Sequence, residues 1–383
     1  MSQSRTVRLT PSILATSALL AWGIVPGAAS GVPGRVRDAL RNDLLSRADY
    51  ERVERGYYEK LTGAAAAPRR PDAAVNANAA LPGHGEPVKV GHGRLTVEVA
   101  DVREFVLRPN LVYDPGRRIP WSTNSWGMRD RAYAEAKPPG TVRVALVGDS
   151  IGAGWGVDDH AGFEPRLEKT WDGRSRAAGG PAVEVLNFSV PGHGPGQRWT
   201  QFSTEGWRFA PDSVVFEATL ADAGWDERRL RAALARGLGF DAPVYQSVLE
   251  HAKVPRGLDA EAYKARLKPL RMELLAGVYR QAVAECRSRG VPVFWALIPR
   301  VGKPLDQDER RELTDLAREA GFDALVDASG AFDGTDPREL AVGPSDYHPN
   351  AEGHRRIAAA LDAALSHRVV PSRPEPRAGA ITR

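Results

Sequence analysis

The sequence contains almost no cysteine: Cys286 is the single one among 383 residues. One cysteine cannot form an intramolecular disulfide, and it leaves no set of thiolate ligands for a metal ion. Two histidines, His84 and His92, lie in a stretch rich in glycine and proline, without acidic or thiol ligands in a usual arrangement. The composition therefore excludes a disulfide-bonded scaffold, and we predict no metal site.

The sequence also lacks a large excess of one charge and a nucleotide-binding motif. The 52 lysines and arginines are interspersed with 48 aspartates and glutamates, so no basic stripe marks a nucleic-acid partner. The glycines of "GDSIGAGWG" lack the spacing of a dinucleotide fingerprint, and no phosphate-binding loop occurs. We therefore predict no nucleic-acid partner and no cofactor.

The apolar run near the start of the sequence, at residues 13–25, is short for a membrane-spanning helix. It is preceded by Arg5 and Arg8 and followed by small residues up to Ala29, which is the order of a secretory signal peptide. We expect residues 1–29 to be a signal peptide, or an uncleaved anchor that keeps the protein near a membrane. On either interpretation the protein is exported, to the periplasm, the cell envelope or the medium.

The rest of the sequence divides into segments of different composition. Residues 30–87 consist of a charged helical segment followed by an Ala/Pro-rich linker. In residues 88–140, apolar and polar residues alternate in short segments, which predicts a small β-rich lead-in to the main domain. We predict the main domain over residues 141–368 and a disordered tail over 369–383. Within the main domain, residues 222–270 exceed what a crossover connection needs and are predicted to form a helical cap insertion.

Strand-like and helix-like stretches alternate through the main domain. Short apolar runs with strand character cover Val142–Val147, Val183–Phe188, Ser213–Glu217 and Val291–Ile298. Amphipathic stretches of helical length cover Phe163–Trp171, Arg271–Arg289 and Gln307–Ala320. Strands that alternate with helices form a parallel sheet with helices on both faces. The predicted fold class is therefore α/β, a three-layer α/β/α sandwich with a parallel sheet.

A serine follows the first of these strands directly, in the tripeptide "GDS". In a parallel sheet, ligands bind beyond the carboxyl ends of the strands, so Ser150 is expected to face a cleft. The glycines around it leave room for a carbonyl group to approach the hydroxyl, as a nucleophile requires. Taken alone, the tripeptide also fits a turn or a helix cap. A base elsewhere in the chain is needed to favour the nucleophile.

The stretch "SDYHPNAEGH" near the end of the main domain supplies a base and an acid. Imidazole suits proton transfer because its pKa lies near neutral pH, and a serine hydroxyl needs such a base to become nucleophilic. Asp346 stands two residues before His348 and points to the same side if this stretch is extended. We predict Ser150 as the nucleophile, His348 as the general base and Asp346 as the carboxylate that orients the imidazole.

With the motifs "GDS" and "HPNAEGHRRIA", the sequence resembles the SGNH (GDSL-type) hydrolases over roughly residues 121–366. It is similar in particular to the exported bacterial branch, in which a short β-rich lead-in precedes "PPGTxRxxxxGDS". The resemblance implies a flavodoxin-like α/β/α sandwich, a Ser–His–Asp catalytic set, and ester hydrolysis or acyl transfer.

The sequence departs from the family pattern in three places. Ser189 stands where the family has the glycine of N-x-G, although a backbone N–H is retained there. Ala221 stands where the family has an asparagine, so one side-chain oxyanion donor is missing. Ser345 occupies the family's usual position for the acid, three residues before the histidine, and Asp346 lies one residue closer.

The resemblance also implies where an oxyanion would be held. The backbone N–H groups of Ser150 and Ser189 are the expected donors. The same two strand ends carry Asp149, Asn187 and His193, which we predict as further oxyanion or substrate-binding residues. Asn187 fits a structural role better, in which it ties down its loop, and His193 fits an ordinary loop residue as well as a substrate contact.

We interpret the protein as an exported serine esterase or deacylase that hydrolyses an acyl ester through an acyl-serine intermediate. The substrate is a small molecule or a glycan, and family analogy points to O-acetyl groups on a carbohydrate. Two alternatives stay open at this point. One is an O-acyltransferase that uses the same residues on a glycan. The other is a catalytically weakened binding protein of the same fold, which Ala221 and Ser189 favour.

Overall fold

A computed structural model of the chain describes residues 95–113, 120–303, 305–343 and 346–369. The predicted signal peptide, charged helical segment and Ala/Pro-rich linker lie outside these residues, as does nearly all of the predicted tail. Within the described ranges, no helix is both long enough and apolar enough to cross a membrane.

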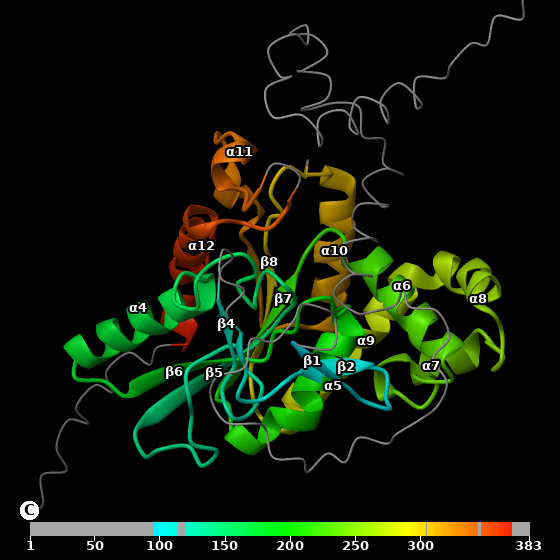
Figure 1. Cartoon of the computed structure of the whole chain (residues 1–383), viewed down its shortest axis with the longest axis horizontal. Coiled ribbons are helices and arrows are strands. Elements are labelled where there is room, and N and C mark those ends of the chain that lie inside the picture. The colour runs from blue at the N-terminus through cyan, green and yellow to red at the C-terminus, as the bar shows by residue number, and fades with distance from the viewer. Residues whose placement is uncertain (1–94, 114–119, 304, 344–345, 370–383) are drawn as a thin grey trace, which may run out of the picture. The chain divides into compact units, whose positions relative to one another are not determined.

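A five-stranded parallel sheet forms the centre of the structure (Figure 1). Its strands are β5 (Thr141–Val147), β6 (Ala182–Asn187), β7 (Ser213–Ala218), β8 (Val293–Leu297) and β9 (Ala324–Asp327). They lie in the order β6-β5-β7-β8-β9, so the chain runs from β5 to one edge and then crosses back to build the other. In such a doubly wound sheet, ligands bind where the direction of winding reverses, beyond the carboxyl ends of the strands.

Alternate residues of each strand serve two separate hydrophobic cores. In β5, Val144 and Leu146 belong to one core, whereas Ala145 and Val147 belong to the other. All six residues of β7 are buried. Because both faces of the sheet are covered, its inner strands are predominantly apolar, with Arg143 in β5 and Glu217 in β7 as buried exceptions, and this property made them recognisable in the sequence.

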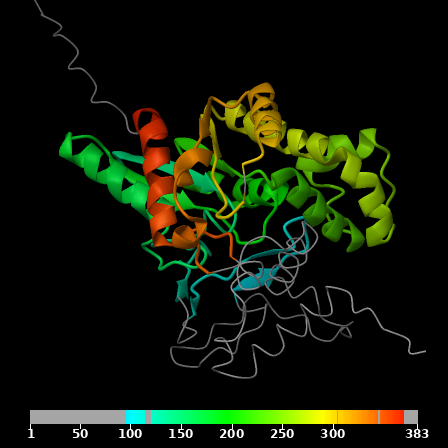
Figure 2. The same cartoon turned by 90° about the horizontal axis from the view of Figure 1, so that it is seen from above.

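Helices form a layer on each face of the sheet. One layer contains α4 (Phe163–Ala177) and α12 (Ala351–Val369), which lie side by side in Figures 1 and 2. The other contains α5 (Pro195–Glu205), α6 (Asp222–Ala235), α9 (Arg271–Ser288) and α10 (Gln307–Ala320). The predicted three-layer α/β/α sandwich is confirmed.

Shorter elements connect these layers. The segment predicted as a helical cap contains α6, α7 (Pro243–His251), α8 (Ala260–Leu267) and the 3₁₀ turn η3 (Lys268–Leu270). Further 3₁₀ turns are η2 (Trp207–Phe209) and η4 (Ser329–Phe332), and α11 covers Pro337–Leu340. Leu230, Ala233 and Leu234 of α6 belong to the same hydrophobic core as α5 and α9. At least this first helix of the segment is therefore part of the sandwich layer.

The β-rich lead-in forms two small antiparallel sheets before the main domain. One pairs β1 (Thr96–Glu98) with β2 (Phe105–Leu107), and the other pairs β3 (Val112–Tyr113) with β4 (Trp121–Ser122). Phe105 and Trp121 pack in one apolar cluster with Ala153 and Val190, which follow β5 and β6. The lead-in thus contacts the two loops in which the sequence places candidate site residues.

Two elements of the sandwich were not predicted. Helix α5 begins inside the glycine-rich stretch after β6, where Pro195 occupies the first turn and the Gln197 side chain accepts the Gly194 N–H at 3.0 Å. Strand β9 has only four residues and pairs with β8 alone. Helix α5 was not predicted because its first residues lie in a glycine-rich stretch that is typical of a loop. Strand β9 was not predicted because four residues are too few to show a hydrophobic periodicity.

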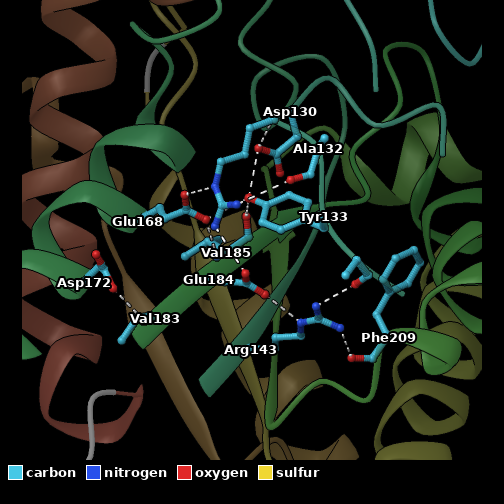
Figure 3. Close-up of polar contacts among 12 residues, drawn as sticks. Asp130, Ala132, Tyr133, Arg143, Glu168, Asp172, Val183, Glu184, Val185 and Phe209 are labelled. Carbon is cyan, nitrogen blue, oxygen red and sulfur yellow. Dashed lines mark hydrogen bonds and ion pairs between the residues drawn. The ribbon is translucent and has the colours of Figure 1, made fainter. Parts of the chain in front are cut away.

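The outer edge of β6 is closed by carboxylates instead of by another strand. The N–H of Val183 donates to Asp172 Oδ1 at 2.9 Å, and the N–H of Val185 donates to Glu168 Oε2 at 2.8 Å (Figure 3). The hydroxyl of Tyr133 also lies 2.7 Å from Glu168 Oε2. These bonds satisfy an edge that would otherwise be open to another strand, and they hold β6 in register up to its end.

Candidate active site

Ser150 lies in a tight turn directly after β5. Its side chain is buried, with 0% of the residue exposed. The Asp149 carbonyl accepts the N–H of Ala153 at 2.9 Å, and the Ser150 carbonyl accepts the N–H of Trp155 at 2.9 Å. The Ile151 N–H donates to Asp149 Oδ1 at 2.8 Å. Backbone bonds on both sides of the serine therefore fix the position of its hydroxyl.

Glycines flank this turn because another side chain occupies the space beside it. A Cβ atom on Gly148 would lie 2.1 Å from Glu217 Oε2, and one on Gly152 would lie 2.3 Å from the same atom. Neither glycine has a positive φ, so close approach and not backbone conformation explains them. The small residues noted in the sequence make room for Glu217 behind the turn.

His348 and Asp346 extend from the Ser150 hydroxyl in a chain of hydrogen bonds. His348 Nε2 lies 2.8 Å from Ser150 Oγ, and His348 Nδ1 lies 2.5 Å from Asp346 Oδ1. The backbone N–H of His348 also donates to Asp346 Oδ1 at 2.8 Å. The structure thus brings together three predicted residues from opposite ends of the main domain.

The surroundings of His348 favour one arrangement of its protons. Burial raises the pKa of Asp346, but the hydrogen bonds and charge of His348 outweigh it and hold that pKa below its usual value. An ionised Asp346 accepts the proton on Nδ1, which leaves Nε2 free to accept from Ser150. Tyr347 stacks on the His348 ring with centroids 4.2 Å apart and restricts its movement.

Asp149 is placed differently from what the sequence led us to expect. Arg198 Nη2 donates to Asp149 Oδ2 at 2.8 Å, and Arg198 Nη1 donates to Asp222 Oδ2 at 3.1 Å. Burial raises the pKa of Asp149, but the charge of Arg198 prevails and holds it below its usual value. Both oxygens of Asp149 are engaged inside the protein, so its contacts support the turn and not a substrate.

Asn187 and Ser189 are linked to each other instead of pointing together into a cleft. The side-chain amide of Asn187 donates to the Gly152 carbonyl at 3.0 Å, and its Oδ1 accepts the Ser189 N–H at 3.1 Å. The expected oxyanion donor of Ser189 is therefore already in use. Asn187 has the structural role considered above, because it connects the loops that follow β5 and β6.

His193 joins the site loop to the lead-in. Its Nε2 lies 2.8 Å from the Phe105 carbonyl, and the two rings lie 5.0 Å apart. Burial is the main cause that lowers the pKa of His193, to about 3, and nearby arginines add to it. A neutral, fully buried histidine in these contacts docks β2 onto the main domain, which differs from the predicted substrate contact.

The third sequence block contributes to the base of the site. Ala221 lies immediately before α6, where it presents only a methyl group. Asp222 accepts the Thr219 hydroxyl at 2.9 Å as well as Arg198. Arg198 was not predicted as a site residue because it lies on α5, which was itself not predicted. Glu217 was not predicted because its position in a strand does not indicate which side chains lie next to it in the fold.

Aromatic residues from the lead-in and the turn lie beside the histidine. The Trp155 ring is 6.4 Å from the His348 ring and 5.3 Å from the Trp121 ring.

Within the described ranges, no three His, Cys, Asp or Glu side chains are grouped so that they could hold a metal ion.

The fold and the hydrogen-bonded serine, histidine and aspartate together define a class of protein, the serine hydrolases. Residues 146–356, more than half of the chain, match the GDSL-like lipase/acylhydrolase family. The chain belongs to this family of SGNH hydrolases, as its motifs indicated. A comparison with curated proteins finds no match.

Solved structures of similar proteins come from several bacteria. A lipolytic protein of the G-D-S-L family from Desulfitobacterium hafniense is 15% identical, with 58% of this chain and 99% of that chain covered and a TM-score of 0.37. A lipase/acylhydrolase from Enterococcus faecalis is 18% identical, with 61% and 100% covered and a TM-score of 0.37. A variant of an acetyl-xylooligosaccharide esterase from Geobacillus stearmophilus is 16% identical, with 61% and 97% covered and a TM-score of 0.38.

Proposed function

We propose that this hydrolase is an exported serine esterase or deacylase that forms an acyl-serine at Ser150. The observation that carries the proposal is the 2.8 Å contact between Ser150 Oγ and His348 Nε2, with Asp346 on the other side of the imidazole. A serine in hydrogen-bond contact with an oriented base is the arrangement that makes a hydroxyl nucleophilic.

The reaction proceeds in two halves. Ser150 Oγ attacks the ester carbonyl while His348 Nε2 takes its proton, and Asp346 stabilises the resulting imidazolium. The imidazolium then gives this proton to the leaving alkoxide, which departs as an alcohol. In the second half, His348 removes a proton from water as the water attacks the acyl-serine. Return of that proton to Ser150 Oγ releases the carboxylic acid.

The oxyanion donors are the weakest part of this arrangement. The N–H of Ser150 remains our proposed donor, whereas the N–H of Ser189 has to be shared with Asn187 Oδ1. Ala221 offers no side-chain donor at the start of α6. Loss of one such donor slows acyl transfer by about a hundredfold to a thousandfold. We therefore propose a slow enzyme, and this feature is what favours the alternative of a weakened binding protein.

The substrate that we propose is an acyl ester, with O-acetyl groups on a carbohydrate as the first to be tested. Water and a sugar hydroxyl can attack the same acyl-serine, so the acceptor alone separates a deacylase from an O-acyltransferase. Export follows from the proposed signal peptide at residues 1–29.

A serine-directed phosphonate probe tests the central claim. We expect it to label Ser150 in the wild-type protein and not in Ser150→Ala, as identified by peptide mass spectrometry. A wild-type protein that is folded but never labelled would identify the chain as a binding protein.

Two further experiments test the finer claims. Incubation with an activated acetyl ester, with and without a glycan acceptor, should release acetate in both cases. Acetylated glycan in place of acetate would indicate the transferase. Amino-terminal sequencing of the exported protein should find a chain that begins near Ser30, whereas an intact Met1 on cytoplasmic protein would contradict export.

A further inference from the structure

A second carboxyl group lies directly behind the turn that carries Ser150. Glu217, in β7, is 1% exposed, and its Oε2 fills the space beside Gly148 and Gly152. After burial, the negative charge of Asp149 is the largest influence on the Glu217 carboxyl group, so the two carboxyl groups are close neighbours. Two ionised carboxylates have only acceptor atoms and repel each other, so a stable buried pair needs a proton on one of the two.

The other contacts show which carboxyl carries that proton. Asp149 accepts two hydrogen bonds, from Arg198 Nη2 and from the Ile151 N–H, each at 2.8 Å. Within the described part of the chain, no N–H or O–H group donates to either carboxyl oxygen of Glu217. A buried carboxylate without donors is costly, whereas a neutral carboxyl can itself donate. Burial and the charge of Asp149 accordingly raise the pKa of Glu217 well above its usual value.

We propose that Glu217 is a positioning residue that works as a neutral carboxylic acid, donating its proton to Asp149 and bracing the turn that presents Ser150. This inference rests on the proposed role of Ser150 as nucleophile. Asp149 immediately precedes the serine and binds the N–H of Ile151 immediately after it. Any shift of Asp149 is therefore transmitted to the distance between Ser150 Oγ and His348 Nε2.

Loss of the proton would leave the site with unbalanced charge. The charged groups that face Glu217 are Asp149 on the turn, Arg198 on α5 and Asp222 at the start of α6. One cation already serves two carboxylates, so an ionised Glu217 would add a third negative charge and repel Asp149. The turn would loosen, and the reactivity of Ser150 would fall at alkaline pH through an ionisation outside the Ser–His–Asp trio.

The test is the rate at which the phosphonate probe labels Ser150, measured from neutral to alkaline pH and corrected for probe hydrolysis. Wild-type protein should lose reactivity on the alkaline side. Glu217→Gln should label normally at neutral pH, because its amide donates to Asp149, and should keep its reactivity at alkaline pH, because an amide does not ionise. Glu217→Leu should label about ten to a hundred times more slowly at every pH, since it leaves Asp149 without its partner.

Glu227→Gln is the matched control. Glu227 is also a buried glutamate, 6% exposed, and burial raises its pKa too, but it lies on α6 and pairs with Arg231. This variant should keep the wild-type pH profile. An unchanged alkaline loss in Glu217→Gln, or a wild-type rate that does not fall at alkaline pH, would overturn the proposal.

Infrared spectroscopy of protein with an intact Glu217 covers the case in which the Glu217 variants do not fold. The Glu164→Gln and Glu227→Gln changes first remove the other two buried glutamates with raised pKa values. With isotope-labelled glutamate in this protein, the carbonyl band of a protonated acid should disappear over the same pH range in which labelling slows, while circular dichroism stays constant. If no glutamate loses a proton over that range, the proposal is overturned. Protein that shows this band but is never labelled at Ser150 would refute the proposed function and leave the protonated Glu217 in place.

Discussion

Two groups of buried carboxyls, one behind the Ser150 turn and one along the edge of β6, solve the same electrostatic problem in different ways. Behind the turn, Asp149 and Asp222 share the fully buried Arg198, and Glu217 completes the group as a neutral acid. This turn cluster combines one buried cation with one retained proton. It keeps Asp149 ionised and the serine in place.

In the edge cluster, which consists of Asp130, Glu164 and Glu168, none of the described ion pairs involves a fully buried cation, since the fully buried Arg143 pairs with Glu184 of β6 instead, at 2.8 Å. Burial and neighbouring carboxylates raise the pKa values of Asp130 and Glu164 well above their usual range. Asp130 Oδ2 accepts the Asn187 N–H at 3.0 Å, much as Glu168 accepts a strand N–H earlier in β6. Arg131 pairs with Glu168 at 2.6 Å, but 49% of its side chain is exposed.

The role of a buried carboxyl group in this protein therefore depends on the hydrogen-bond donors around it and not on whether it belongs to aspartate or glutamate. Backbone donors along β6 give the edge cluster a structural role. The buried guanidinium of Arg198 holds Asp149, the residue before the nucleophile, so the turn cluster helps to position Ser150. The following predictions separate the two.

The largest effect is expected from removing the nucleophile that the turn cluster supports. Ser150→Ala should lower ester turnover about 10⁴-fold or more, because neither attack nor acyl transfer is then possible. Thermal unfolding should change little, since the hydroxyl bonds only His348 among the described residues. A variant that keeps more than a tenth of wild-type activity on a purified activated ester would place the nucleophile elsewhere.

The orienting acid comes next. Asp346→Ala should lower turnover about a thousandfold or more, because the imidazole loses the group that fixes its tautomer. Steady-state kinetics with the same ester, together with circular dichroism, measure this effect. Near-wild-type rates would show that the site is a Ser–His pair oriented by some other group.

The two clusters can be compared directly by removing the arginine of an ion pair in each of them. Arg198→Met should lower the free energy of unfolding by about 3–5 kcal/mol, because it leaves two carboxylates buried without their partner. Arg131→Met, the matched change in the edge cluster, should cost less than about 1 kcal/mol because its pair is exposed to solvent. Urea unfolding of both variants measures the difference. Equal losses would contradict the distinction between the clusters.

The protons that the edge cluster retains should make the free energy of unfolding depend on pH. The pKa of Glu164 is raised by burial above its usual 4.5, so the folded protein holds this proton more tightly than the unfolded chain. The contribution of Glu164 to the free energy of unfolding is fully present below pH 4.5, and it is lost as the pH rises through the pKa that Glu164 has in the folded protein.

Glu164→Gln removes this ionisation. The variant should therefore match the wild type in acid and exceed it in alkaline solution, as urea unfolding at several pH values would show. A difference of the opposite sign would mean that Glu164 is ionised in the folded protein.

The smallest effect is expected at the missing donor. Ala221→Asn should raise turnover of an activated ester by a few fold at most, since a grafted donor is rarely well placed. The measurement is kcat, with Ala221→Leu as the control for added bulk. Equal rates in Ala221→Asn and wild type would show that an amide at the start of α6 does not reach the oxyanion.

The architecture of the sandwich and the family could be predicted from the amino-acid sequence. Mostly apolar runs such as Val142–Val147 predicted inner strands, because a strand buried on both faces consists largely of apolar residues. The motifs around Ser150 and His348 identified the family, which the match over residues 146–356 confirms. These signals are local, since each depends on neighbours within a few positions along the chain.

Which polar groups contact each other could be seen only in the folded protein. It assigned Asp149 to Arg198, the Ser189 N–H to Asn187, and His193 to the lead-in, none of which the sequence predicted. It also placed Glu217 behind the nucleophile's turn. The physical reason is that the charge and protonation of a buried group depend on the donors around it. Those donors come from segments that meet only after the chain has folded.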